Sequence, residues 1–231
     1  MSLQYCKNLK FKRRCKMLLV VMASVLMLIV PVQQKAQSFV NEQMLQRLNK
    51  QYSMQAKQRG VALNKLLKTL ADKDTNKQLT EVNRFFNQFK YKSDLKLWGQ
   101  KDYWATPEEF LGVNSGDCED YVVAKYFALR SLGVADKHLY LTYVKAVREN
   151  IAHMVLSYFE TPKSIPLILD NYNPRILRAD KRRDLLPVYS FNAKSLFLTN
   201  ASAGLGRSLP TDKIKNNKWQ KLLANMKRSN P

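Results

Sequence analysis

The stretch that decides the fold is residues 115–133, SGDCEDYVVAKYFALRSLG. Ser115-Gly116-Asp117 has the residue types that open a helix, and apolar residues then recur at helical spacing from Tyr121 to Leu132. Gly133 follows as the C-terminal cap. The stretch therefore predicts a helix that carries Cys118 in its first turn.

Helical patterns precede this stretch, and strand patterns follow it. From Phe39 to Phe89 apolar residues recur every three or four positions, and Thr106-Pro107-Glu108-Glu109 has the features of a helix start. Helices first and strands second predict an α+β fold with an antiparallel sheet. The expected strands, rich in Val, Ile, Leu and Tyr, are His138–Val147, Ile151–Phe159, Pro166–Asp170 and Leu186–Phe191.

The first 38 residues have the pattern of an export segment. Six Lys and Arg residues precede an uncharged run of 16 residues from Met17 to Val32, and small residues follow near Ala36 and Ser38. This order is typical of a secretory signal peptide. The run is only slightly shorter than a membrane span of about 20 residues, so an uncleaved N-terminal anchor remains the alternative. Either form predicts that the rest of the chain is exported.

The rest of the chain has the length of one domain. We expect residues 39–198 to form it and residues 199–231 to be a basic C-terminal extension. The extension is rich in Lys and has a helical pattern around Trp219–Met226, and we expect it to be a surface appendage.

The net charge and the number of cysteines have to be counted again without the export segment. The 231 residues carry a formal charge of +21, which favours an anionic partner such as nucleic acid or a membrane surface. Residues 1–38 hold seven of the basic residues and no acid, which leaves 32 basic against 18 acidic residues, a net charge of +14. Export makes nucleic acid an unexpected partner. Cys6 and Cys15 also lie in this segment, so Cys118 has no partner for an internal disulfide.

Three residues have the types and order of a cysteine hydrolase site. The free N–H groups and dipole at a helix start favour a Cys118 thiolate and can donate to an oxyanion. His153 lies within one strand and Asp170 ends the next, so antiparallel pairing would let the acid orient the imidazole. The plainer alternatives are that Cys118 is a small buried apolar residue and His153 a core histidine. The other histidine, His138, begins a strand, and we interpret it as structural.

The residues flanking Cys118 are acidic. Asp117, Glu119 and Asp120 place three carboxylates within four positions of a basic chain. Carboxylate oxygens suit a hard cation, and Ca²⁺ best of all, although the spacing is not that of an EF-hand. The alternative is that these acids only complement the helix dipole.

Taken together, these segments resemble the bacterial transglutaminase-like cysteine proteinase family, of the LapG type. The resemblance covers roughly residues 80–198, and its separated motifs occur in the expected order. These motifs are Trp104–Phe110, Gly116–Tyr121, Ala124–Phe127, Leu132–Val134, His153–Leu156, Leu169–Asn171 and Arg183–Asn192.

The resemblance implies a papain/transglutaminase-like fold with Cys118 as nucleophile, His153 as base and Asp170 as orienting acid. It also implies calcium held beside the nucleophile by Asp117, Glu119 and Asp120. Members of the family are periplasmic and cut a very large surface adhesin near its N-terminus, at a di-alanine site, which releases the adhesin and promotes biofilm dispersal. An inner-membrane cyclic-di-GMP receptor of the LapD type holds the protease inactive.

Two other functions stay open on the residues alone. The same fold and triad support acyl transfer, as in transglutaminases, where an amine resolves the thioester. A non-catalytic, basic exported binding module would use the positive charge and the Lys-rich extension. The oligomeric state, the adhesin and the surface that meets the receptor are not indicated by the sequence.

Overall fold

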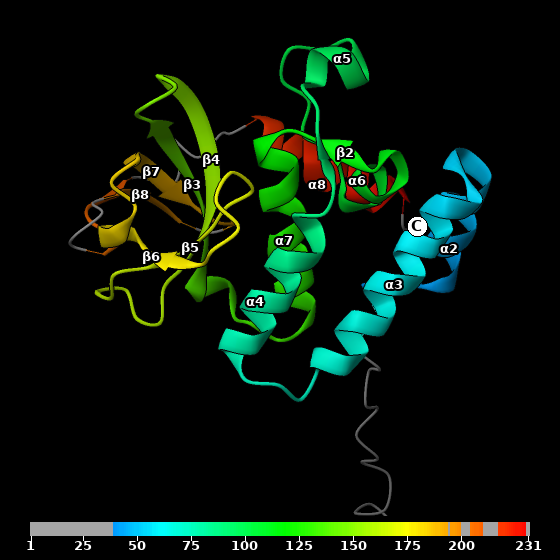
Figure 1. Cartoon of the computed structure of the whole chain (residues 1–231), viewed down its shortest axis with the longest axis horizontal. Helices are drawn as coiled ribbons and strands as arrows, with labels where there is room; N and C mark the ends of the chain where they lie inside the picture. Colours follow the sequence, from blue (N-terminus) through cyan, green and yellow to red (C-terminus); the bar gives the residue numbers. More distant parts are fainter. Residues whose placement is uncertain (1–38, 194, 200–203, 210–216, 230–231) are drawn as a thin grey trace, which may run out of the picture. The chain divides into compact units, whose positions relative to one another are not determined.

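An antiparallel sheet forms one layer of the fold, and the helix that begins at Cys118 packs against one of its faces. The computed structural model describes residues 39–193, 195–199, 204–209 and 217–229, so the predicted export segment lies outside the described residues. The strand order is β6-β5-β4-β3-β7-β8-β9, with each neighbouring pair antiparallel (Figure 1). Helices precede the strands along the chain, which confirms the predicted α+β fold.

The four predicted strands are all present, with ends that differ by at most one residue. They are β3 (Leu139–Ala146), β4 (Ile151–Tyr158), β5 (Leu167–Leu169) and β7 (Leu185–Phe191). β5 has only three residues but lies within a predicted apolar run, whereas the other strands of two or three residues show no such run, and the sequence does not predict them. These are β6 (Leu177–Arg178), β8 (Leu196–Leu198) and β9 (Ser208–Leu209), together with a separate parallel pair, β1 (Lys90–Tyr91) and β2 (Ser115–Gly116).

The helical region before residue 90 divides into several helices. They are α2 (Glu42–Arg47), the π-helical turn η1 (Leu48–Tyr52), α3 (Met54–Leu70) and α4 (Thr75–Phe86). Farther along the chain lie α5 (Asp94–Trp98), α6 (Pro107–Val113), α7 (Cys118–Ser131) and α8 (Asn217–Ser229), with short 3₁₀ turns at Asp136–His138 and Ala179–Lys181. None of these helices, which cover only the described residues, has the length and apolar character needed to cross a membrane.

The predicted helix ends are confirmed. Thr106 and Glu109 form a reciprocal capping box at the start of α6, with Pro107 as its first residue. Asp117 is the N-cap of α7, and Gly133 follows the helix with a left-handed φ of 92°. Both capping arrangements fix where their helices begin, and the second fixes Cys118 at the start of α7.

Helix α7 lies in the middle of the molecule and is buried on nearly all sides. One side packs against Met154 and Leu156 of β4, and α4 and α6 pack on the other. A helix buried all round carries apolar residues on every face, which explains its weak amphipathic pattern. This packing holds the first turn of α7 beside β4.

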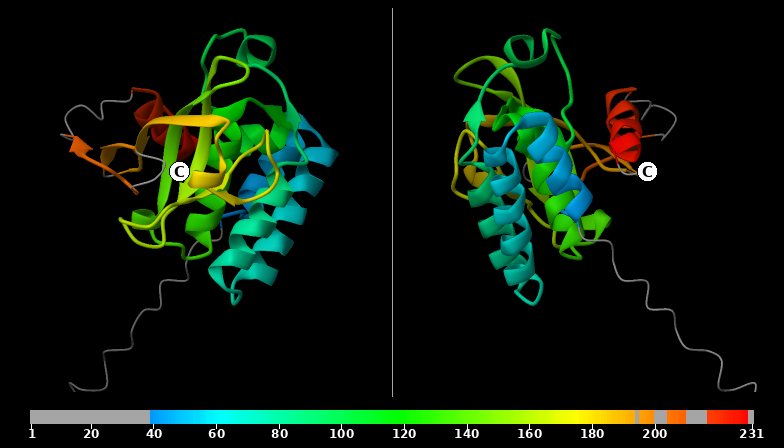
Figure 2. Two further views of the ribbon diagram at one scale, coloured as in Figure 1. Left: turned by 60° about the vertical axis from the view of Figure 1, so that its left-hand side comes forward. Right: turned by 90° about the vertical axis from the view of Figure 1, so that its right-hand side faces the viewer.

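The C-terminal helix α8 is part of the same hydrophobic core, so the expectation of a surface appendage is wrong for this segment. Trp219 and Leu222 are buried, and the Trp219 ring stacks on Phe127 of α7 with an interplanar angle of 9°. Figure 2 shows α8 on one side of α7 and the helices α3 and α4 on the other. Burial of a large apolar side chain contributes about 1.5–3 kcal/mol, so Trp219 and Leu222 anchor α8 to the core.

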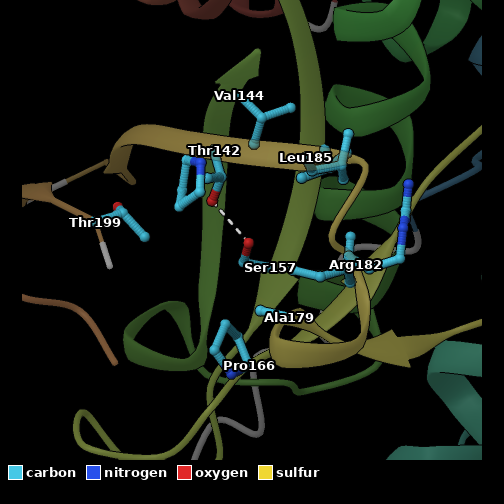
Figure 3. Close-up of a pocket in the computed structure, with 11 residues that line it drawn as sticks. Thr142, Val144, Ser157, Pro166, Ala179, Arg182, Leu185 and Thr199 are labelled. Carbon is cyan, nitrogen blue, oxygen red and sulfur yellow. Dashed lines mark hydrogen bonds between the residues drawn. The ribbon is translucent and has the colours of Figure 1, made fainter. Parts of the chain in front are cut away.

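The far face of the sheet has a smaller core and a small cavity. Val144, Val155 and Leu185 form this core, as the alternation along β4 predicts. The cavity has a volume of about 20 Å³, room for one water molecule. The hydroxyl groups of Thr142 and Ser157 share a hydrogen bond of 2.7 Å at its centre (Figure 3).

Candidate functional site

Cys118 begins α7 immediately after a tight approach of the backbone to the helix. A side chain at Gly116 would place a Cβ atom 2.4 Å from the Asp120 carboxylate, so glycine is required at that position. The Asp120 carboxylate in turn accepts the backbone N–H of Asp117 at 3.3 Å. These contacts fix the path of the chain into the helix and hold Cys118 partly buried at its N-terminus.

The structure brings His153 and Asp170 together, as the sequence predicts. Strands β4 and β5 are antiparallel with Leu156 opposite Leu169, so Asp170 continues β5 towards His153. The His153 Nε2 atom lies 2.8 Å from Asp170 Oδ1, and both side chains are buried. An ionised Asp170 accepts from Nε2–H, which leaves the Nδ1 lone pair available to take a proton.

Cys118 lies next to this pair. The backbone N–H of Met154, the residue after His153, donates a hydrogen bond to the Cys118 sulfur. The His153 Nδ1 atom is buried and has no hydrogen-bond partner among the described residues. Cys118, His153 and Asp170 therefore lie together in the fold, in an arrangement that suits a nucleophile, a base and an orienting acid.

Two residues that the sequence reasoning missed hold the histidine and the aspartate in position. Arg182 is buried, and its Nη2 lies 2.7 Å from Asp170 Oδ2 and 2.7 Å from Asp184 Oδ2. The Tyr172 ring stacks on His153 with 4.2 Å between ring centroids, and its backbone N–H donates to Asp170 Oδ1 at 3.0 Å. Tyr172 follows Asp170 by two positions, which is the only sequence signal that could have pointed to it.

The contacts of Asp170 keep it ionised. Burial by itself would raise the pKa of this carboxyl, but hydrogen bonds from His153, the Tyr172 N–H and Arg182 outweigh burial and lower the pKa to about 2. The same donors occupy lone pairs on both oxygens of the Asp170 carboxylate. Asp170 therefore has the charge and the orientation needed to direct the imidazole.

His138 lies away from this site, at the start of β3. Its Nδ1 atom is 2.7 Å from the carbonyl oxygen of Phe159, and its ring lies beside Tyr158. These contacts tie the 3₁₀ turn to the end of β4, which agrees with the structural role expected for this histidine.

On the other side of Cys118 lies a cluster of carboxylates. The three acids that the sequence indicated are joined by Asp94 and Asp102, which lie on and beside α5. Ligand atoms within 4.8 Å of one another are found in the groups Asp94-Asp117-Asp120 and Asp94-Asp102-Glu119. Asp94 and Asp102 thus come from a segment about 20 residues earlier in the chain than Asp117. No local pattern in the sequence indicates that these two acids join the cluster.

Lys218 pairs with Asp102 at the exposed edge of this cluster, but the other four carboxylates have no ion pair among the described residues. Burial raises the pKa of Asp94 to about 6 and that of Asp117 to about 8, and repulsion between the carboxylates adds to both. Burial likewise raises the pKa of Asp120 and Glu119. One oxygen of Asp94 and one of Asp117 are buried without a hydrogen-bond partner among the described residues. Hard oxygen ligands with unmatched charge are the donor set of a divalent cation such as Ca²⁺.

The carboxylates also act on the nucleophile. The Cys118 sulfur lies 3.1 Å from Glu119 Oε2, to which the thiol donates. Burial raises the pKa of the Cys118 thiol, Glu119 and Asp117 raise it further, and the Met154 N–H opposes them. The sequence argument expected the helix N-terminus to favour the thiolate, but here burial and the neighbouring carboxylates have the larger effect.

Comparison with known proteins gives one family. Residues 48–184 match the sequence model of the family described as bacterial transglutaminase-like cysteine proteinase. Three solved structures of Legionella pneumophila LapG are similar to the chain, each with 41% sequence identity over 79% of this chain. Their TM-scores are 0.67 for LapG, 0.68 for EGTA-treated LapG and 0.66 for calcium-bound LapG, with 95%, 95% and 97% of those chains covered. A search of curated protein sequences gave no match.

Proposed function

This chain belongs to the bacterial transglutaminase-like cysteine proteinase family, and we propose that it is a periplasmic, calcium-dependent endopeptidase that cuts a large cell-surface adhesin. That the chain is a cysteine protease follows from the family and from the similarity to LapG. The observation that carries the assignment of residues is the buried His153–Asp170 pair, 2.8 Å apart, beside the sulfur of Cys118.

The residues support a covalent mechanism in which His153 moves the proton. Its Nδ1 atom takes the proton of Cys118, and the thiolate attacks the carbonyl carbon of the scissile peptide bond. Free N–H groups in the first turn of α7 stabilise the oxyanion. His153 returns the proton to the leaving amine, and water then hydrolyses the thioester with His153 as base. Asp170 stabilises the imidazolium form in each step.

The carboxylate cluster fits a calcium ion, with Asp117, Glu119 and Asp120 as ligands from α7 and Asp94 and Asp102 as further ligands. Calcium in this place would supply the positive charge that the carboxylates lack beside the nucleophile. LapG of Legionella pneumophila, the structural relative, occurs in a calcium-bound form.

The proposed substrate and regulation come from the resemblance to the LapG type. The substrate is the N-terminal region of a large adhesin, cut at a di-alanine site, so that the adhesin leaves the cell surface. An inner-membrane cyclic-di-GMP receptor of the LapD type would bind the protease and hold it inactive. The periplasmic location is supported by the basic, then apolar, pattern of residues 1–38.

The proposal is tested by incubating residues 39–231 with an N-terminal fragment of a candidate adhesin. We expect cleavage at one site with Ca²⁺, its loss with EGTA, and its loss in Cys118→Ala. Cleavage by Cys118→Ala would contradict the triad, and equal activity and thermal stability in EGTA would contradict the calcium site. A cross-linked product in place of cleaved fragments would favour the acyltransferase alternative.

A further inference from the structure

An apolar pocket opens at the end of the sheet where β3, β4 and β7 come together. Its volume is about 300 Å³, and its lining includes Tyr143, Ile151, Ala152, Val188 and Tyr189. Ile151 and Val188 are 43% and 50% exposed, large fractions for apolar side chains on strands. The pocket takes no part in the triad or in the carboxylate cluster, so its role has to be sought elsewhere.

The residues that line the pocket are neighbours, along β4 and across the sheet, of residues at the catalytic site. Ala152 immediately precedes His153, and Tyr143 is opposite Met154, whose N–H contacts the Cys118 sulfur. The phenol of Tyr143 also lies within electrostatic reach of Glu119. The starts of β4 and α7 lie at the same end of the molecule (Figure 1). A polypeptide whose scissile bond lies against Cys118 must therefore pass close to this pocket.

The position and volume of the pocket indicate which residue of the substrate enters it. Ile151 is two residues from His153 along β4, a distance of about 7 Å at the rise of an extended strand. An extended substrate rises by about 3.3 Å per residue, so a distance of about 7 Å corresponds to the second or third residue from the scissile bond. Its volume is at the lower end of the range for small-ligand sites and accepts one large apolar side chain.

We infer that this pocket binds a large aliphatic or aromatic side chain of the substrate, two or three residues from the scissile bond. The inference rests on the proposed function, because the occupant is the protease's own substrate. The pocket then sets specificity by burying one apolar side chain, as Tyr143 and Tyr189 form its walls and Val188 lies at its rim.

The experiment uses the exported chain with Ca²⁺, a proteome-derived peptide library as probe, and mass spectrometry to read cleavage sites on both sides of the scissile bond. The variants are Val188→Glu and Ile151→Glu. The matched control is Val61→Glu on α3, because Val61 is 47% exposed and lies on another part of the molecule. The rate of Cys118 alkylation by iodoacetamide reports whether the nucleophile and its surroundings are intact.

We expect the wild-type protein to prefer apolar residues at one position, the second or third from the cut. Val188→Glu and Ile151→Glu should lose that preference and cleave such peptides at least tenfold more slowly, with unchanged alkylation of Cys118. Val61→Glu should behave as wild type. Cleavage without an apolar preference, or a preference retained in both pocket variants, would overturn the pocket and leave the protease assignment intact. Absence of Cys118-dependent cleavage of both the library and the adhesin fragment would overturn the proposed function and the pocket together, whereas cleavage of the adhesin fragment with no large apolar residue two or three positions from the cut would overturn the pocket alone.

Discussion

Replacement of Lys125 by Met should stabilise the protein at neutral pH. Lys125 is a fully buried residue of α7, and its Nζ atom has no hydrogen-bond partner among the described residues. The nearest favourable contact is the face of the Tyr121 ring, 5.7 Å away. An amine in such surroundings is costly in its charged form, because the protein replaces water by an apolar environment.

The size of the effect follows from the pKa of Lys125. Burial lowers the pKa from 10.5 to about 7, against the attraction of Asp170. The unfolded chain keeps the higher pKa, so between pH 7 and 10.5 it binds a proton that the folded chain lacks. Folding stability therefore rises with pH across this range, and at pH 7 the penalty is about 4 kcal/mol at 1.36 kcal/mol per pKa unit. Methionine fills a similar volume without that penalty.

Urea unfolding of both proteins at pH 7 and pH 10 measures this difference. We expect Lys125→Met to gain at least about 2 kcal/mol at pH 7 and less than about 1 kcal/mol at pH 10, because pH 10 is close to the pKa of 10.5 of the unfolded chain and little of the penalty remains there. Lys68→Met, a change at an exposed position of α3, serves as the control and should alter stability little at either pH. Equal or lower stability of Lys125→Met at pH 7, or the same gain at both values, would refute the reasoning.

Three further predictions concern other parts of the site and the core. Arg182→Met should cost about 3–5 kcal/mol in urea unfolding because it leaves the Asp170 carboxylate buried without its cationic partner, and Arg182→Lys should restore part of the loss. The depressed pKa of Asp170 contributes stability above pH 4 that is lost as the pH falls to about 2, so thermal unfolding of Asp170→Asn should be less sensitive to acid in that range. Calcium at 100 times its dissociation constant should stabilise the protein by about 2.7 kcal/mol, and Asp94→Asn should remove most of the resulting rise in melting temperature; an unchanged rise would exclude Asp94 as a ligand.

The parts of the fold that the sequence predicted are those with long periodic patterns. The α7 helix and the strands β3, β4 and β7 have enough residues for an apolar repeat to show, and capping residues mark the ends of the helix. The three-residue strand β5 was predicted from the apolar run that ends at Asp170. The short strands β6, β8 and β9 have no such repeat, and pairing with a neighbouring strand alone defines them. The packing of Trp219 against α7 is likewise tertiary, since nothing in a Lys-rich segment shows which core its aromatic ring will enter.

The same distinction applies to the residues of the candidate site. Cys118, His153 and Asp170 were predictable because each has a fixed place on its own helix or strand, and the order of these elements brings them together. Asp94 and Arg182 were not, because each reaches the site from a loop or a helix of five residues whose position depends on the whole fold. The sequence therefore indicates the groups proposed to react and omits many of the groups that hold them in position.

The two sides of the nucleophile differ in how their negative charges are balanced. Asp170 has a buried cationic partner in Arg182, and together with the Tyr172 N–H this partner fixes the acid that orients His153. Among the carboxylates around Asp117, Asp102 is paired with Lys218, whereas Asp94, Asp117, Glu119 and Asp120 have no ion pair among the described residues, and burial raises their pKa values. The fold by itself therefore holds His153 in position. The negative charge beside Cys118 is balanced only when a cation binds to the carboxylates. Control of the enzyme by a cation would then act on the nucleophile and leave the His153–Asp170 pair unchanged.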